Sequence, residues 1–214
     1  MKIENILKNY DSGFELDIPC LELKGNVIGI LGHIGSGKTS LLKTLSKLNN
    51  GSYTRSGNDY FYMVEFDKLP RSKVRLISNV FESIKPHFNR DRFNSLLDIF
   101  KIDSEDITSE LSDGQKKILS FILTISIESE ILLLDEPFSK IDPYNRKNMI
   151  NTIIEVAKNY KHIIVASHEI GNLQRIIDYA VLIKDGKIIN SSSIEIIEKD
   201  FPDIKEWYRE NYKD

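Results

Sequence analysis

One glycine-rich segment also contains a lysine and a threonine, at a spacing that suits a bound phosphate chain. Its residues are Gly32, His33, Ile34, Gly35, Ser36, Gly37, Lys38 and Thr39, followed by Ser40. Glycine permits backbone angles that turn consecutive N–H groups toward one anion. In this pattern the lysine reaches the β- and γ-phosphates of a nucleotide, and the hydroxyl after it binds Mg²⁺. The segment predicts a phosphate loop, the alternative being a glycine-rich turn with an incidental lysine.

Two adjacent carboxylates end an aliphatic run further along the chain. Asp135 and Glu136 follow Ile131–Leu134, which indicates a buried strand whose carboxyl end bears both acids. We expect Asp135 to orient Mg²⁺ and its waters, and Glu136 to act as general base on an attacking water. Two acids at a strand end are also compatible with a merely solvated edge. Their pairing with the phosphate loop favours catalysis.

A third segment, Leu111–Gln115, reads Leu-Ser-Asp-Gly-Gln and precedes an apolar-striped run. Ser112 and Gln115 have the spacing of a capping box, which requires no ligand. The start of a helix is also a ready site for an anion. Both interpretations place the beginning of a helix at Ser112.

The elements that must position these residues alternate between strand and helix patterns. An antiparallel pair is predicted for Ile3–Tyr10 and Phe14–Leu23. Further strands are expected at Val27–Leu31, Tyr60–Glu65, Ile131–Asp135 and Ile163–Ser167, with a hairpin of Tyr179–Lys184 and Lys187–Asn190. Such alternation predicts a mainly parallel α/β core.

Helical periodicity fills most of the intervening chain. A helix should follow the phosphate loop, since Leu41, Leu42, Leu45 and Leu48 form one stripe. Gly51–Asp59 is expected to be a loop, and the chain from there to Glu110 is largely helical after its strand. Further helices are expected at Ser112–Ser129, Pro143–Asn159 and Ile170–Ile177, and an amphipathic tail from Ile194.

Composition narrows the class of protein. The 214 residues are 41% hydrophobic and 29% charged, as is usual for globular chains. A net charge of −3 argues against binding through an overall positive field, so we expect no nucleic-acid partner. A single cysteine, Cys20, excludes an internal disulfide and favours the cytoplasm. The longest mainly apolar run, Ile118–Ile127, falls short of the ~20 residues that span a bilayer.

The motifs and their order resemble those of ABC ATPases over nearly the whole chain. Leu111–Gln115 is similar to the signature motif of that family, usually written LSGGQ. Ser139–Pro143 resembles the D-loop, and His168 looks like the switch histidine at the end of the next strand. Tyr10, upstream of the phosphate loop, resembles the aromatic residue that stacks on adenine.

The resemblance implies an α/β P-loop NTPase fold of the ABC type. A mainly parallel sheet core is expected, with an N-terminal antiparallel β subdomain and an inserted α-helical subdomain. In residue numbers, 1–214 would be a single ABC ATPase domain. Its ATP-binding core would be 1–65 and 130–214, and its helical subdomain 66–129 would carry the signature motif.

The family also implies a mechanism and a set of site residues. Two ABC domains pair head to tail, and ATP on one phosphate loop is capped by the signature helix of the other. His168 would contact the γ-phosphate and help to position Glu136, and Asp142 would communicate across the pair. Besides the phosphate loop, the implied ATP contacts are Tyr10, Glu65, Ser112, Gly114, Gln115 and Asp142. Catalysis would rest on Lys38, Glu136 and His168, and Mg²⁺ binding on Thr39, Glu65 and Asp135.

Two positions depart from the family pattern. A glutamine normally senses Mg²⁺ and water at the position aligned with Glu65. A carboxylate still binds Mg²⁺ but lacks the amide donor. Asp113 replaces the first glycine of the signature pair, and we hypothesise that its charge weakens ATP-driven pairing. Hydrolysis is still expected, because the acids and the lysine are retained.

The resulting hypothesis is an ATPase subunit that drives a membrane transporter. Its partners would be a second copy or a homologous ATPase subunit, and separate transmembrane permease subunits that dock beside Glu65 and the helical subdomain. It would lie on the inner face of the cell membrane. The short stretch after His168 leaves no room for the regulatory domain that some importers carry, which favours an exporter. The alternatives are a soluble ABC ATPase of an assembly or repair complex, and a weakly hydrolysing nucleotide-binding module.

Overall fold

The computed structural model describes residues 2–47, 60–61, 69–85 and 87–213. The expected loop Gly51–Asp59 and the candidate site residue Glu65 lie outside the described residues. Nothing in the described ranges forms a helix that is long and apolar enough to span a bilayer.

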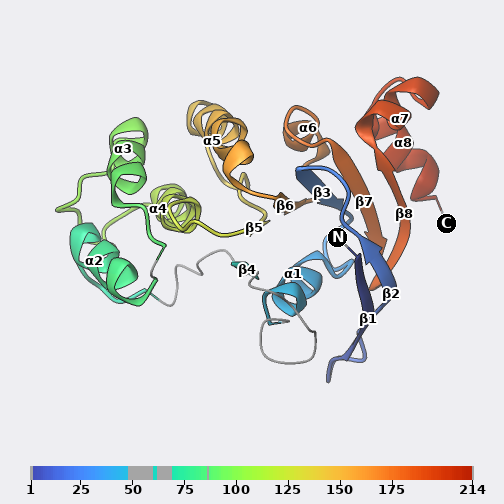
Figure 1. Cartoon of the computed structure of the whole chain (residues 1–214), viewed down its shortest axis with the longest axis horizontal. Coiled ribbons are helices and arrows are strands. Elements are labelled where there is room, and N and C mark those ends of the chain that lie inside the picture. Colours follow the sequence, from blue (N-terminus) through green and yellow to red (C-terminus); the bar gives the residue numbers. More distant parts are fainter. Residues whose placement is uncertain (1, 48–59, 62–68, 86, 214) are drawn as a thin grey trace.

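A six-stranded sheet lies at the centre of the molecule, in the order β4-β5-β6-β3-β7-β8 (Figure 1). Its strands are β3 (Val27–Leu31), β4 (Tyr60–Phe61), β5 (Ile131–Asp135), β6 (His162–Ser167), β7 (Tyr179–Lys184) and β8 (Lys187–Ser193). All neighbours are parallel except β7 and β8, which form the expected hairpin. The prediction of a mainly parallel core is confirmed.

Each central strand divides its side chains between two apolar cores. Val27 and Leu31 of β3 contribute to one core, and Ile28 and Ile30 contribute to the other. Successive side chains of a strand point to opposite faces, so a continuous apolar run is what a sheet covered on both faces requires.

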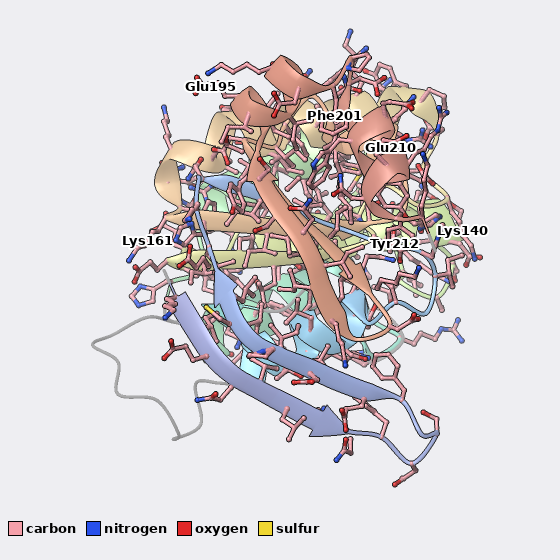
Figure 2. The ribbon with its side chains drawn as sticks, turned by 90° about the vertical axis from the view of Figure 1, so that its right-hand side faces the viewer. Lys140, Lys161, Glu195, Phe201, Glu210 and Tyr212 are labelled. Carbon is pink, nitrogen blue, oxygen red and sulfur yellow. The ribbon has the colours of Figure 1, made fainter. Side chains whose placement is uncertain are left out.

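A two-stranded antiparallel sheet covers one edge of this arrangement. It consists of β1 (Lys2–Asn9) and β2 (Glu15–Glu22), and Figure 2 shows the pair crossing below the main sheet. Ile6 lies opposite Ile18 in the register, and both are buried. The backbone N–H of Asp17 donates to the carbonyl of Gly186 at 3.0 Å, which joins β2 to the β7–β8 turn. The antiparallel pair predicted for Ile3–Tyr10 and Phe14–Leu23 is confirmed.

Helices surround the main sheet. They are α1 (Lys38–Lys47), α2 (Val74–Ile84), α3 (Arg90–Phe100), α4 (Asp113–Ile125), α5 (Pro143–Val156), α6 (Ile170–Leu173), α7 (Ile194–Asp200) and α8 (Ile204–Asn211), with a 3₁₀ turn at Ala157–Asn159. In Figure 1, α2, α3 and α4 gather at the end of the molecule remote from β1 and β2. The ring centroids of Phe100 and Phe121 lie 6.1 Å apart within this lobe.

Two helices end earlier than their sequence pattern predicts. The helix expected to reach Ser129 ends at Ile125, because the carbonyl of Ile125 accepts hydrogen bonds from Arg92 (3.0 Å) and Tyr160 (3.0 Å) and is withdrawn from the helix ladder. The helix expected over Ile170–Ile177 ends at Leu173, and the chain then turns to enter β7.

Candidate functional site

The glycine-rich segment forms the loop between β3 and α1. It follows Leu31, the last residue of β3, and because β3 runs parallel to β6 and β7 the loop begins at the carboxyl edge of the sheet. Gly35 and Gly37 have φ angles of 85° and 107°, in the left-handed region that favours glycine. A Cβ on Gly32 would lie 2.4 Å from the carbonyl oxygen of Ile183. The glycines are therefore required by the shape of this loop.

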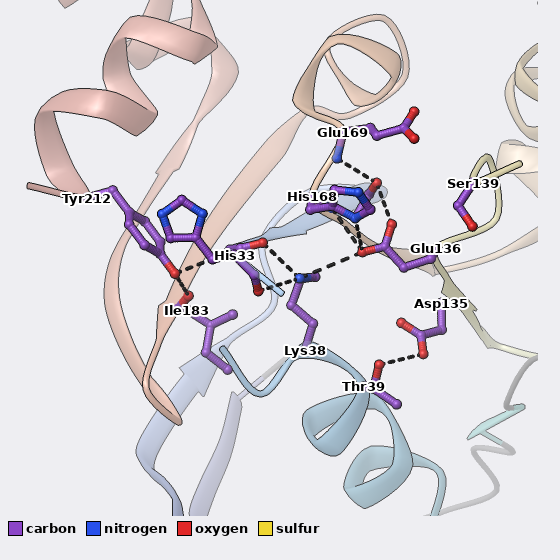
Figure 3. Close-up of polar contacts among 12 residues, drawn as sticks. His33, Lys38, Thr39, Asp135, Glu136, Ser139, His168, Glu169, Ile183 and Tyr212 are labelled. Carbon is purple, nitrogen blue, oxygen red and sulfur yellow. Dashed lines mark hydrogen bonds and ion pairs between the residues drawn. The ribbon is translucent and has the colours of Figure 1, made fainter. Parts of the chain in front are cut away.

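Lys38, at the end of the loop, is hydrogen-bonded to the beginning of the loop. Its Nζ donates to the carbonyl oxygens of Gly32 (2.8 Å) and His33 (2.9 Å), and lies 3.7 Å from Oε1 of Glu136 (Figure 3). The residue is only 5% exposed. Desolvation lowers the pKa of Lys38, whereas the carboxylates of Glu136 and Asp135 act to raise it. A buried cation thus lies between the loop and the two acids.

The two acids project from the end of β5. Oδ2 of Asp135 accepts a hydrogen bond of 2.7 Å from the hydroxyl of Thr39. The backbone N–H of Glu136 donates to the carbonyl of Ala166 at 2.8 Å, on the neighbouring strand β6. Parallel pairing of β5 with β6 therefore determines where both carboxylates emerge.

Residues at the end of β6 orient the carboxylate of Glu136. Its Oε1 accepts from the backbone N–H of His168 (3.0 Å) and lies 2.8 Å from Nδ1 of the same residue. Its Oε2 accepts from the hydroxyl of Ser167 at 3.0 Å. Both oxygens are thus held while the side chain of His168 stays 37% exposed. The structure thus brings Glu136 and His168 together.

A cavity of about 470 Å³ opens over the loop and Glu136. Lys38, Thr39, Ser40, Glu136 and His168 line it, together with Ile34, Gly35, Gly37, Tyr10, Ser12 and Phe14. At its aromatic end the rings of Tyr10 and Phe14 lie 5.6 Å apart, and Nζ of Lys8 lies 4.7 Å from the centroid of the Tyr10 ring. The volume is within the usual range for small-molecule sites.

Several predicted contacts lie outside this cavity lining. Ser112 and Gln115 form the capping box: Oγ of Ser112 accepts from the N–H of Gln115 (3.2 Å), and Oε1 of Gln115 accepts from the N–H of Ser112 (3.0 Å). Gly114 lies in the same first turn of α4. Asp142 caps α5, and the N–H of Asn145, together with further N–H groups of this turn, lowers the pKa of its carboxyl. Within one chain, these residues have structural roles.

Two polar residues near the acids carried no sequence signal of their own. Ser167 merely precedes the predicted histidine. Lys117 lies in α4, where a lysine usually indicates a solvated face. Its Nζ instead donates to Oγ of Ser139 at 2.7 Å, and burial lowers its pKa against the opposing pull of Glu136. The link joins α4 to the loop that follows the acids.

The side-chain oxygens beside the phosphate loop are candidate ligands of a metal ion. No cluster of three or more His, Cys, Asp and Glu side chains suited to a metal occurs in the described ranges. Mg²⁺ at a nucleotide needs only one or two protein oxygens, since phosphates and water complete its shell. The adjacent hydroxyl of Thr39 and carboxylate of Asp135 fit that requirement.

Comparison with known proteins identifies the family. The sequence model of the ABC transporter family matches residues 21–139, more than half of the chain. The chain belongs to the ABC transporter family. It is an ATP-binding subunit of that family, an ATPase coupled to transport. The expected membership of the ABC ATPase family and the expected P-loop fold of the ABC type are both confirmed.

Individual relatives agree with this family. The chain is 26% identical over 200 residues to the ABC transporter ATP-binding protein YtrB of Bacillus subtilis (strain 168), covering 85% of this chain and 68% of the relative. It is 26% identical over 241 residues to the methionine import ATP-binding protein MetN of Campylobacter jejuni, covering 91% and 71%. The solved structure of an ATP-binding subunit of an ABC transporter matches the fold with a TM-score of 0.83, at 17% identity and 99% coverage of both chains. The import protein among these relatives gives no support to the expectation of an exporter.

The turn between β7 and β8 is hydrogen-bonded to the phosphate loop. The N–H of Gly186 donates to the carbonyl of Ser36 at 2.9 Å, and its φ angle is 78°. A Cβ there would lie 1.9 Å from the carbonyl oxygen of Glu15. Gly13 offers a contrast, because its φ is 81° but nothing lies within 4 Å of the Cβ position.

We expect Gly186→Ala to destabilise the protein more than Gly13→Ala. In both variants an alanine must adopt a left-handed conformation, which costs about 1–2 kcal/mol. Only Gly186→Ala adds a backbone clash. Urea unfolding should show an additional loss of at least about 1–2 kcal/mol for Gly186→Ala. Equal unfolding free energies for the two variants would show that the contact with Glu15 is unimportant.

Proposed function

We propose that this ABC ATPase binds ATP with Mg²⁺ in the cavity above the phosphate loop, hydrolyses it with Glu136 as general base, and thereby powers a membrane transporter. The observation that supports this most directly is the Glu136 carboxylate. Ser167 and His168 hold both of its oxygens at the edge of a cavity that also contains Lys38 and Thr39.

The phosphate chain would lie over the loop between β3 and α1. Lys38 donates to two loop carbonyls. In the P-loop pattern the lysine reaches the β- and γ-phosphates, and this ammonium would do so here. Thr39 and Asp135 would hold Mg²⁺, which supplies neutralisation of phosphate charge. Tyr10 would stack on the base, and its place at the aromatic end of the cavity supports that assignment.

Glu136 would accept the proton of the attacking water. A general base must be oriented before it acts, and the hydroxyl of Ser167 with the backbone N–H of His168 supplies that orientation. The His168 ring lies against the same carboxylate and lines the cavity, so it would contact the γ-phosphate and steady the water.

We expect Glu136→Gln to abolish turnover while nucleotide binding survives. An amide of the same shape cannot accept the proton of the water, and general-base catalysis contributes about 10²–10⁴-fold. Steady-state phosphate release should fall by at least about 100-fold with the ATP dissociation constant within threefold of wild type. Glu155→Gln, at an exposed position of α5, is the matched control. A Glu136→Gln variant that still turns over would refute the assignment of this base.

ATP would also join two subunits head to tail. The first turn of α4 lies outside the cavity of its own chain, and Ser112 and Asp113 are exposed there. A helix start that faces solvent is available to an anion held by another molecule. The exposed Asp113 carboxylate would then approach the γ-phosphate of the partner and oppose it.

Removing the charge of Asp113 should strengthen this pairing. Two like charges about 4 Å apart in water repel by about 1 kcal/mol, so Asp113→Asn should lower the ATP concentration for half-maximal dimerisation by about fivefold. Analytical ultracentrifugation in the Glu136→Gln background would measure it. Asp91→Asn is the control, because Asp91 occupies the first turn of α3. An unchanged midpoint for Asp113→Asn would contradict the hypothesis.

The permease would dock on α2. Leu76, Val80 and Ile84 recur every fourth residue and are 42%, 54% and 61% exposed, while Ile77 and Phe81 on the other face are buried. Such a row of exposed aliphatic side chains on one helix face is unusual for a solvated surface. We assign it to a cytoplasmic segment of a separate transmembrane subunit.

A charge placed in this row should weaken membrane association. Val80→Asp would require a carboxylate to be desolvated in the contact, and the amount of permease that co-purifies from detergent-solubilised membranes should fall several-fold. Ser95→Asp adds the same charge at an exposed site of α3 and should have no effect. Equal recovery of permease with both variants would show that Leu76, Val80 and Ile84 do not contact the permease.

A further inference from the structure

The phosphate loop is also held at His33, a residue that does not line the cavity. The hydroxyl of Tyr212, just beyond α8, accepts a hydrogen bond from the backbone N–H of His33 at 3.1 Å (Figure 3). The same hydroxyl donates to the carbonyl of Ile183 at 3.0 Å. One phenol therefore joins the loop to the end of β7, using its single proton and one lone pair.

Aromatic rings reinforce this junction. The rings of His33 and Tyr212 meet edge to face with centroids 4.3 Å apart, and Tyr208 stacks on Tyr212 at 4.6 Å. Nζ of Lys184 lies 5.6 Å from the centroid of the Tyr212 ring. Packing thus fixes the direction in which the Tyr212 hydroxyl points.

Helix α8, which contains Tyr208 and ends just before Tyr212, is anchored in the protein. Ile204 and Trp207 of α8 are 2% and 3% exposed and belong to the larger apolar core. Figure 2 shows Tyr212 beside the strands of the β7–β8 hairpin. Because α8 is fixed to the core, a hydrogen bond from Tyr212 restrains the loop against a rigid body.

The restraint reaches Lys38 through a single residue. The carbonyl of His33 accepts from Nζ of Lys38 at 2.9 Å, while its N–H is held by Tyr212. Displacing the backbone of His33 would therefore displace the acceptor that places the lysine ammonium. Tyr212 itself does not line the cavity.

We propose that Tyr212 is a positioning residue for nucleotide binding, which holds the phosphate loop through His33 and so sets the place of Lys38. This inference rests on the proposed ATP site. Tyr212 touches no substrate, so its contribution is to the geometry of the groups that do.

Tyr212→Phe tests the role because it removes the hydroxyl and keeps the ring. A hydrogen bond of this kind contributes a factor of about three to ten, so the dissociation constant of Mg-ATP and the KM should rise about three- to tenfold. The kcat should stay within twofold, since Glu136, Ser167 and His168 are untouched. Calorimetry and steady-state kinetics on the full chain measure these quantities.

Tyr179→Phe is the matched control. It removes a hydroxyl that donates to Ser191 at 3.1 Å, within the same β7–β8 hairpin and away from the loop. Its KM and dissociation constant should equal those of wild type. Equal losses in both tyrosine variants would indicate a general loosening of the hairpin and would overturn the positioning role.

A double-mutant cycle tests the route through Lys38. In a Lys38→Ala background, Tyr212→Phe should change the dissociation constant by less than twofold. Additive losses would overturn the route through the lysine. A wild-type chain that binds no Mg-ATP would refute the proposed ATP site itself. Wild-type binding with an unchanged Tyr212→Phe variant would refute only the role of Tyr212.

Discussion

The parallel register of three strands determines the geometry of this site. β3, β6 and β5 are hydrogen-bonded side by side, so that Leu31 is level with Ser167 and Asp135 is level with Ala166. Their carboxyl ends therefore meet at one edge, where the phosphate loop, the two acids and the histidine follow in adjacent positions. A slip of one residue would move each side chain to the other face of the sheet. Residues separated by more than a hundred positions in sequence are brought together by this backbone pairing.

Electrostatics explain how the cluster around Lys38 is held together. Lys38 is buried, and a buried ammonium is unfavourable unless anionic or carbonyl oxygens replace the lost water. Two loop carbonyls and the Glu136 carboxylate provide them. The site is thus organised around a buried cation held by two carbonyl oxygens and one carboxylate.

The sequence predicted most of the sheet and the centre of the site, because those features depend on local patterns. Val27–Leu31 and Ile131–Asp135 are strands with the predicted bounds, and Gly35 and Gly37 after β3 have the expected left-handed angles. Other features depend on partners remote in the chain. The end of α4 is set by Arg92 and Tyr160, and the loop contact of Tyr212 spans 179 positions. Neither leaves a periodic signal, and transport direction has no counterpart in the motifs at all.

The capping box of α4 has a thermodynamic consequence for a closed pair. Ser112 and Gln115 already satisfy each other, so in the proposed pair a phosphate that displaced either group would exchange existing hydrogen bonds for new ones. Such an exchange would yield only a small net free energy. A pair closed through exchanges of this kind would depend on all of its contacts being made at once, and it would reopen when any one was lost.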